Sequence, residues 1–153
     1  MFSKEETREQ NVQFWNGFQK FMSKQRSVNG RKMNWLNYPS DVKNIYVRLE
    51  VDNKGARLCF DIQPKDDSIR SILWEQMTEL KQVLEDTTVL APEWIENYLY
   101  MGKYISRIVW KNESLNFYNS DDRDAIYDYL KERLIKFDLF YQEYKEILIS
   151  LAH

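Results

Sequence analysis

The chain has 153 residues, a net charge of −2, and a hydrophobic share of 43%. This length suits one domain with a real hydrophobic core, so residues 1–153 are predicted to form a single domain. The near-neutral balance excludes a chain-wide attraction to nucleic acid or to an anionic membrane.

Cysteine usage and the N-terminal residues indicate the compartment. The single cysteine, Cys59, excludes an internal disulfide and is typical of a reducing environment. Residues 1–6 become charged with no apolar signal segment behind them. No stretch approaches the roughly 20 apolar residues that a spanning helix needs. These features predict a soluble cytoplasmic protein without membrane contact.

The N-terminal part predicts a helix followed by a loop and a strand. Ser3 and Glu6 form a capping box, so a helix is expected after Ser3 and as far as Lys24. Its predicted core-facing stripe consists of Phe14, Trp15, Phe18, Phe21 and Met22. Asn29-Gly30 then signals a loop, and residues 33–38 are predicted to form a short strand.

Residues 45–63 predict a β-hairpin, because apolar and polar residues alternate on both sides of a turn signal at residues 52–55. Pairing Val51 with Ala56 sets polar residues opposite polar ones, which favours an even-numbered loop. The predicted buried face holds Ile45, Val47, Leu49, Val51, Leu58, Phe60 and Ile62. The predicted polar face holds Tyr46, Arg48, Glu50, Arg57, Cys59, Asp61 and Gln63.

The remaining elements complete an α+β prediction. Pro64 ends the hairpin, and Asp66-Asp67-Ser68 caps a second helix that stops near residues 86–88. Strands are predicted over residues 94–101, 104–110 and 115–118. The order α-β-β-β-α-β-β-β-α(-α) predicts a mostly antiparallel sheet of about five strands packed against helices.

The last helical region begins near Ala125 and contains no glycine or proline. A straight helix of that length would extend about 45 Å, which exceeds the width of a domain of this size. The sequence therefore predicts either a kink near residues 131–137 or an end that protrudes to meet a partner.

Two interpretations of the polar hairpin face stay open. Arg48, Glu50, Arg57 and Asp61 would form either a ladder of surface ion pairs, each worth about 0–1 kcal/mol, or a site for an anion or a metal. The element order also matches that of PD-(D/E)XK nucleases, whose hairpin acids hold Mg²⁺. The corresponding candidates are Glu50 or Asp52, then Asp61 and Gln63, but Gln63 stands where a lysine is expected. No metal or cofactor is expected outside this nuclease alternative.

Other chemistry has less support in the sequence. A basic loop would suit nucleic-acid contact through Lys24, Arg26, Arg31 and Lys32 with Trp35. A solvated loop after a helix C-terminus, where cations are favoured, is the preferred explanation of the same residues. The only histidine is the terminal residue, so a Ser-His or Cys-His nucleophile and a Cys/His zinc site are not expected.

A pattern of aromatic residues and helix ends extends along nearly the whole chain. It consists of Phe14-Trp15 with Phe18, Trp35, Ile45-Tyr46-Val47-Arg48, Glu75-Gln76 through Leu84-Glu85, and Ser106-Arg107-Ile108. In this pattern the chain resembles an uncharacterised bacterial family, domain of unknown function 4268 (DUF4268). The resemblance implies no established catalytic residue. It draws attention to Glu85 and to Arg107 as a further member of the polar face, and a structural salt bridge between these two would equally explain them.

Two functional hypotheses follow. Longer relatives of the family place such a domain after a nuclease-like domain, which implies an accessory module of a DNA-processing system. The first hypothesis is therefore a non-enzymatic interaction module that dimerises or binds a partner through its C-terminal helical region. Its motivation is the supply of rings there, Phe137, Phe140, Tyr141 and Tyr144, which exceeds what a small domain needs to bury. The second is a divergent metal-dependent nuclease or nucleic-acid binder that uses Glu50, Asp61 and Gln63.

Overall fold

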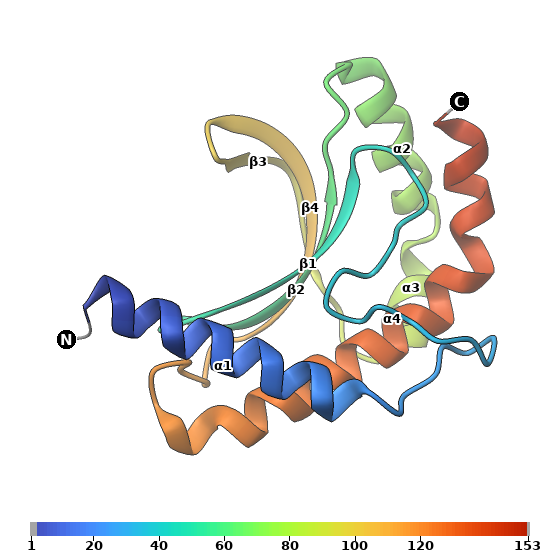
Figure 1. The fold of residues 1–153 in the computed structure, drawn as a ribbon. Coiled ribbons are helices and arrows are strands. Elements are labelled where there is room, and N and C mark those ends of the chain that lie inside the picture. Colours follow the sequence, from blue (N-terminus) through green and yellow to red (C-terminus); the bar gives the residue numbers. More distant parts are fainter. Residues whose placement is uncertain (1–2, 153) are drawn as a thin grey trace.

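The protein is an α+β domain, seen in a computed structural model that describes residues 3–152 (Figure 1). The elements are α1 (Lys4–Met22), β1 (Ile45–Asp52), β2 (Gly55–Ile62), α2 (Asp67–Glu79), α3 (Lys81–Thr88), β3 (Glu93–Tyr100), β4 (Lys103–Asn112), the 3-10 turn η1 (Ser120–Asp122) and α4 (Arg123–Leu151). The strands form one antiparallel sheet in the order β1-β2-β4-β3. No helix in the described residues has the length and apolar character needed to cross a membrane.

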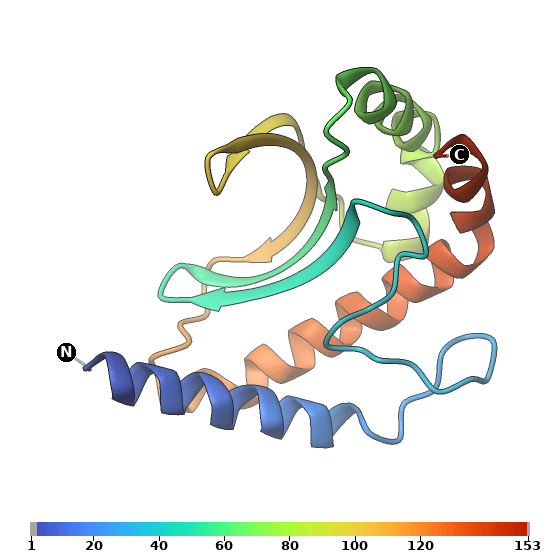
Figure 2. The ribbon, with the colours of Figure 1, turned by 45° about the horizontal axis from the view of Figure 1, so that its top comes forward.

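The sheet is strongly curved. One of its faces is covered by helices, and the other is concave. Figure 2 shows α1 and α4 on one side, while β3 and β4 arch over the other, concave side. The predicted register is confirmed, since Val51 lies opposite Ala56 and Glu50 opposite Arg57. The helix-facing side of β1 and β2 is apolar as expected, with Phe60 and Ile62 fully buried.

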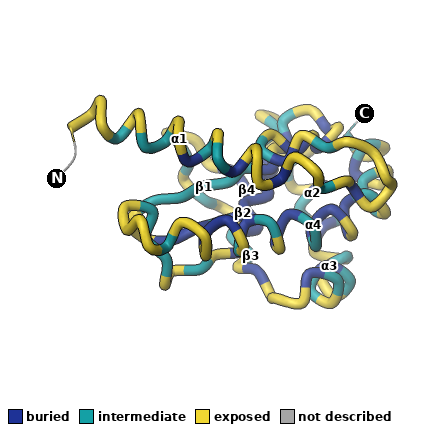
Figure 3. The backbone as a smooth tube through the Cα atoms, turned by 60° about the horizontal axis from the view of Figure 1, so that its bottom comes forward, coloured by how far each residue is buried: buried dark blue, intermediate teal, exposed yellow. Residues whose placement is uncertain are grey.

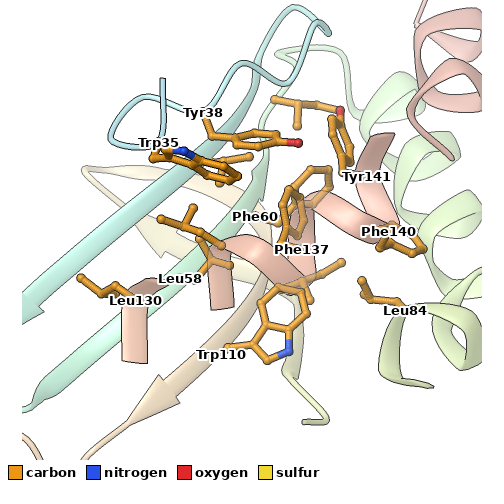
Figure 4. Packing of buried hydrophobic residues seen from close by; sticks show 14 of the residues in the cluster. Trp35, Tyr38, Leu58, Phe60, Leu84, Trp110, Leu130, Phe137, Phe140 and Tyr141 are labelled. Atoms are coloured by element: carbon orange, nitrogen blue, oxygen red, sulfur yellow. The ribbon is translucent and has the colours of Figure 1, made fainter. Parts of the chain in front are cut away.

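The core lies between the sheet and α4. Figure 4 shows Phe137 and Tyr141 of α4 reaching Phe60 of β2, and the Phe137 and Tyr141 rings stack with their centroids 5.2 Å apart. Buried positions concentrate in β2, β4 and the middle of α4 (Figure 3). The C-terminal rings Phe137, Phe140 and Tyr141 therefore belong to the protein's own core.

Four strands are present among the described residues, so the prediction of about five was wrong. Residues 33–38 form a loop, because their aromatic groups bond to side chains and carbonyls outside any ladder. Trp35 Nε1 donates to the Gln25 carbonyl at 3.0 Å, and Tyr38 donates to Asp138 at 2.6 Å. Residues 115–118 are likewise irregular and attach to β1 through the Phe117 N–H and the Asp52 carbonyl at 3.0 Å.

The predicted second helix is two helices. Its start is confirmed, since the Asp66 carboxylate accepts the N–H groups of Ser68 and Ile69. At Leu80 the backbone leaves the helical region, with φ −91° and ψ 4°, and α3 begins at Lys81. Of the apolar residues in α2, Leu73 and Met77 are buried, whereas Ile69 and Ile72 are exposed.

The long helix α4 is continuous from Arg123 to Leu151. Figure 1 shows it bending as it passes the sheet, after which its last turns lie beside α2 and α3 with Leu148 buried. A bend thus accommodates its length. Asp138, also buried, accepts hydrogen bonds from Ser27 and Tyr38 and so fastens the loop after α1 to this helix.

Candidate functional site

The concave face of the sheet carries six charged side chains in mutual contact, which we call the concave ion network. Three strands supply it, because every second residue of each strand points to the same face. Asp61 of β2 lies directly opposite Arg107 of β4, and Glu50 of β1 lies opposite Arg57 of β2. The network consists of Arg48, Glu50, Asp52, Arg57, Asp61 and Arg107.

Asp61 is the centre of the network and is fully buried. Its carboxylate accepts Nε and Nη2 of Arg107 at 2.7 and 2.9 Å. It also accepts Nη1 of Arg48 at 2.6 Å, and that same nitrogen donates to Gln63 at 2.8 Å. Two guanidinium groups therefore satisfy a carboxylate that has no access to solvent, as a buried charge requires.

Glu50 connects this centre to the hairpin end. It accepts Arg57 Nε at 3.1 Å and Arg107 Nη2 at 3.2 Å. Burial raises the pKa of Glu50, but the charge of Arg107 and the hydrogen bonds from Arg57 and Arg107 outweigh it and leave the pKa below its ordinary value. Arg57 also donates to Asp52 at 2.6 Å, and this hydrogen bond lowers the pKa of Asp52.

Tyrosine rings cover the network. The Arg48 guanidinium carbon lies 4.6 Å from the ring centroid of Tyr46 and 4.7 Å from that of Tyr100. Arg107 lies 4.5 Å from the ring of Tyr98. Because β1 and β3 are opposite edges of the sheet, contact between Arg48 and Tyr100 shows that the concave face curls closed over its charges. Such cation–π contacts strengthen where water is excluded.

The arrangement is electrically self-contained, with three cations and three anions. Arg107 Nη2 lies within hydrogen-bond distance of both Glu50 and Asp61, at the point where the two carboxylates converge. In residues 3–152 no group of three or more His, Cys, Asp or Glu side chains has a metal-binding arrangement. Cys59, on the same face, is fully buried and burial raises the pKa of its thiol, so a reactive thiolate is disfavoured.

The predicted site residues thus divide into groups. Arg48, Glu50, Arg57, Asp61, Gln63 and Arg107 come together on one face. Arg107 does not pair with Glu85, which instead accepts Trp94 Nε1 at 3.3 Å. The basic loop is separate: Lys24, Arg26, Arg31 and Lys32 are exposed, whereas Trp35 is only 3% exposed and offers no free ring face for stacking.

A second feature, missed from the sequence, is a groove of about 800 Å³ between the start of α2 and the β3–β4 hairpin. Lys65, Arg70, Lys103 and Tyr104 line it together with Asp67. These residues come from three segments, and no motif joins them. The sequence analysis also missed that the Tyr98 and Tyr100 rings cover the concave ion network. Their spacing of two within a predicted strand places both rings on one face and could have indicated this.

Comparison with known proteins identifies a family but no function. A model of the family described as "Domain of unknown function (DUF4268)" matches residues 10–145 and so covers most of the chain, which confirms the resemblance. No curated protein and no solved structure matches the chain.

Proposed function

We propose that this chain, which belongs to the DUF4268 family, is a non-enzymatic binding module, accessory to a bacterial DNA-processing system and cytoplasmic. In this proposal the concave ion network is a structural element. It holds the curved sheet closed, and the protein's function lies on the outer surfaces that this frame presents.

The position of Arg107 carries the proposal. Its guanidinium occupies the space where Glu50 and Asp61 converge, and its side chain is only 3% exposed. A Mg²⁺ ion at the same place would have to displace a cation that makes hydrogen bonds to both acids. Uncoupling a buried ion pair costs about 3–5 kcal/mol, and this cost disfavours a metal there.

One observation favours the nuclease alternative and makes it worth testing. The Glu50 and Asp61 carboxylates both reach the same nitrogen of Arg107, so the acids do converge as two metal ligands would. Gln63, at the position of the expected lysine, accepts a hydrogen bond from Arg48 and is not placed as a free base. The acid pair is thus present, but a protein cation already neutralises it.

A partner surface on the C-terminal helical region stays a prediction, but it now depends on other residues than the aromatic rings. The rings that motivated it are buried or half-buried, and what α4 exposes is an apolar stripe of Leu139, Ile147 and Leu151. These residues lie eight and four positions apart, which is helical spacing on one face. A homodimer or a partner helix would bury this stripe.

Calorimetric titration and a hydrolysis assay test the proposal. Metal-free protein is titrated with Mg²⁺ and with Mn²⁺. It is then incubated with single- and double-stranded DNA and RNA, beside a control for background nuclease at equal protein load. No binding heat and no cleavage are expected. Saturable Mn²⁺ binding that Asp61→Asn abolishes, or cleavage that EDTA stops, would contradict the proposal.

A further inference from the structure

We propose that the groove between α2 and the β3–β4 hairpin binds single-stranded nucleic acid. We call it the end groove. This inference rests on the proposed function, because it names the ligand of a non-enzymatic module. It assigns binding to residues outside both the concave ion network and the basic loop at residues 24–32.

The end groove has the size and construction of a binding site. Its volume of about 800 Å³ falls in the range of ligand sites in proteins. One wall comes from residues 63–65 and the first turns of α2, and the other from Asn97 and residues 103–105 of the hairpin. In Figure 1 the start of α2 and the β3–β4 arch lie on either side of the neighbouring strand ends.

Positive charge in the end groove is not neutralised, in contrast to the concave ion network. Lys65 and Lys103 are exposed, and in the described residues neither has an ion-pair partner. The single acid of the lining, Asp67, is 3.7 Å from Arg70. The groove therefore has a surplus of two positive charges in a chain whose net charge is −2.

Arg70 forms a fixed part of the groove wall. Its Nη1 donates to the Glu96 carbonyl at 3.1 Å, to Asn97 at 3.3 Å and to the Ser106 hydroxyl at 3.0 Å. These bonds attach α2 to the irregular point of β3, where the pairing with β4 shifts between Ile95 and Tyr98. A rigid wall of this kind limits the entropy lost when a ligand binds.

The groove continues along the sheet, which favours an extended anion over a compact one. A second hollow of about 580 Å³ shares Asn44 with the end groove, and Lys43 and Tyr46 line it. Arg48 lines it too, but its guanidinium is already engaged by Asp61 and Gln63. Lys43 is exposed and has no ion-pair partner in the part of the chain described. Lys43, Lys65 and Lys103 thus border two adjacent hollows, which together we call the path around the end of the sheet.

Exposed tyrosines on this path favour nucleic acid over an acidic peptide. Tyr104 in the end groove is 64% exposed and Tyr46 in the second hollow is 43% exposed. Single strands are bound by cations that follow the phosphates and by aromatic rings on which bases stack, and a duplex hides its base faces. The path therefore fits an unpaired strand.

Fluorescence anisotropy with a labelled 15-nucleotide dT strand, at a series of salt concentrations, tests the inference with the full chain. Each phosphate contact contributes a slope of about −0.7 to the dependence of log affinity on log salt for single strands. The double variant Lys65→Glu/Lys103→Glu is expected to reduce the slope by about 1.4 and to weaken binding by at least about tenfold. Tyr104→Ala is expected to weaken binding about fivefold or more, because it removes one stacked base.

The matched control is Lys24→Glu/Lys32→Glu, which changes the net charge equally at exposed lysines outside the path. We expect it to alter affinity less than about threefold at about 150 mM salt, because exposed charges further from the strand than the Debye length of about 8 Å are largely screened. Thermal unfolding of all variants verifies that they fold.

Several outcomes would overturn the inference. They are no binding by the unchanged protein at about 50 mM salt, an equal loss in the control variant, binding of the matching duplex with the same affinity, or equal competition by polyglutamate. Any of them would leave the proposed function standing, because that proposal is decided by the metal and hydrolysis experiments.

Discussion

Replacing Asp61 with asparagine should destabilise the protein far more than the same change at an exposed acid of the same sheet. Asp61 is fully buried and accepts three hydrogen bonds from Arg48 and Arg107, at 2.6, 2.7 and 2.9 Å. The amide has nearly the same shape, so the change removes the charge and leaves the packing. Two arginines would then face a neutral group in a place that water hardly reaches.

The expected cost follows from these contacts. Breaking a buried ion pair costs about 3–5 kcal/mol. In the variant, Arg107 still has its hydrogen bond to Glu50, and Arg48 still has its hydrogen bond to Gln63. The loss of unfolding free energy should therefore lie near the lower limit, at about 3 kcal/mol. For a domain of this size that corresponds to a fall in Tm of about 6–12 °C.

Urea unfolding followed by tryptophan fluorescence provides the measurement, with Glu93→Gln as the matched control. Glu93 is exposed and pairs with Lys111 at 3.4 Å, so its loss should cost less than about 1 kcal/mol. A cost for Asp61→Asn that is no larger than the control would refute the view that the network holds the sheet closed.

Four further predictions test other parts of the structure. Arg57→Gln removes the hydrogen bond that lowers the pKa of Asp52 and one of the contacts that, after the charge of Arg107, lower the pKa of Glu50. The stability that comes from a lowered acid is present above its ordinary pKa, 4.5 for Glu50 and 3.8 for Asp52, and is lost as the pH falls through the lowered pKa. The wild-type advantage in urea melts should therefore shrink below about pH 4.5, and a constant difference would contradict this. Cys59 should react with a thiol reagent only after unfolding, because it is buried, and rapid labelling of native protein would show the concave face to be open. Gly17→Ala should destabilise the protein by more than about 1 kcal/mol in the same melts, despite the better helix propensity of alanine. The added Cβ would meet the Tyr127 hydroxyl, which is held in place because it donates to the Phe14 carbonyl at 2.6 Å. A stabilised variant would refute this packing. If the α4 stripe is a dimer contact, light scattering should give a dimer that Ile147→Glu converts to a monomer, while a monomer at high concentration would remove that prediction.

The hairpin and its faces were predictable because local pattern and register agree. Alternation fixes which side each residue takes, and polar pairs such as Glu50 with Arg57 identify the pairing. The capping box at Ser3 was equally local, and its side chain accepts the Glu6 N–H as expected. Short-range rules succeed where the residues that decide the structure are near in sequence.

The failures concern contacts between distant residues. Residues 33–38 have the composition of a strand, but Tyr38 bonds to Asp138, a hundred positions away, and so the segment follows α4 instead of the sheet. Sheet curvature was also unpredictable, yet it brings Tyr100 of one edge strand over Arg48 of the other. It turns a predicted ladder of surface ion pairs into a half-buried network whose centre, Asp61 and Arg107, is buried.

The most direct test of the central claim is paramagnetic broadening by Mn²⁺ in the amide NMR spectrum. If Arg107 neutralises Glu50 and Asp61, trace Mn²⁺ should cause no selective broadening at residues 48–63 or 105–109. Selective loss of the Glu50, Asp61 and Arg107 signals, reversed by Mg²⁺, would mean that a metal replaces the guanidinium and would contradict the account.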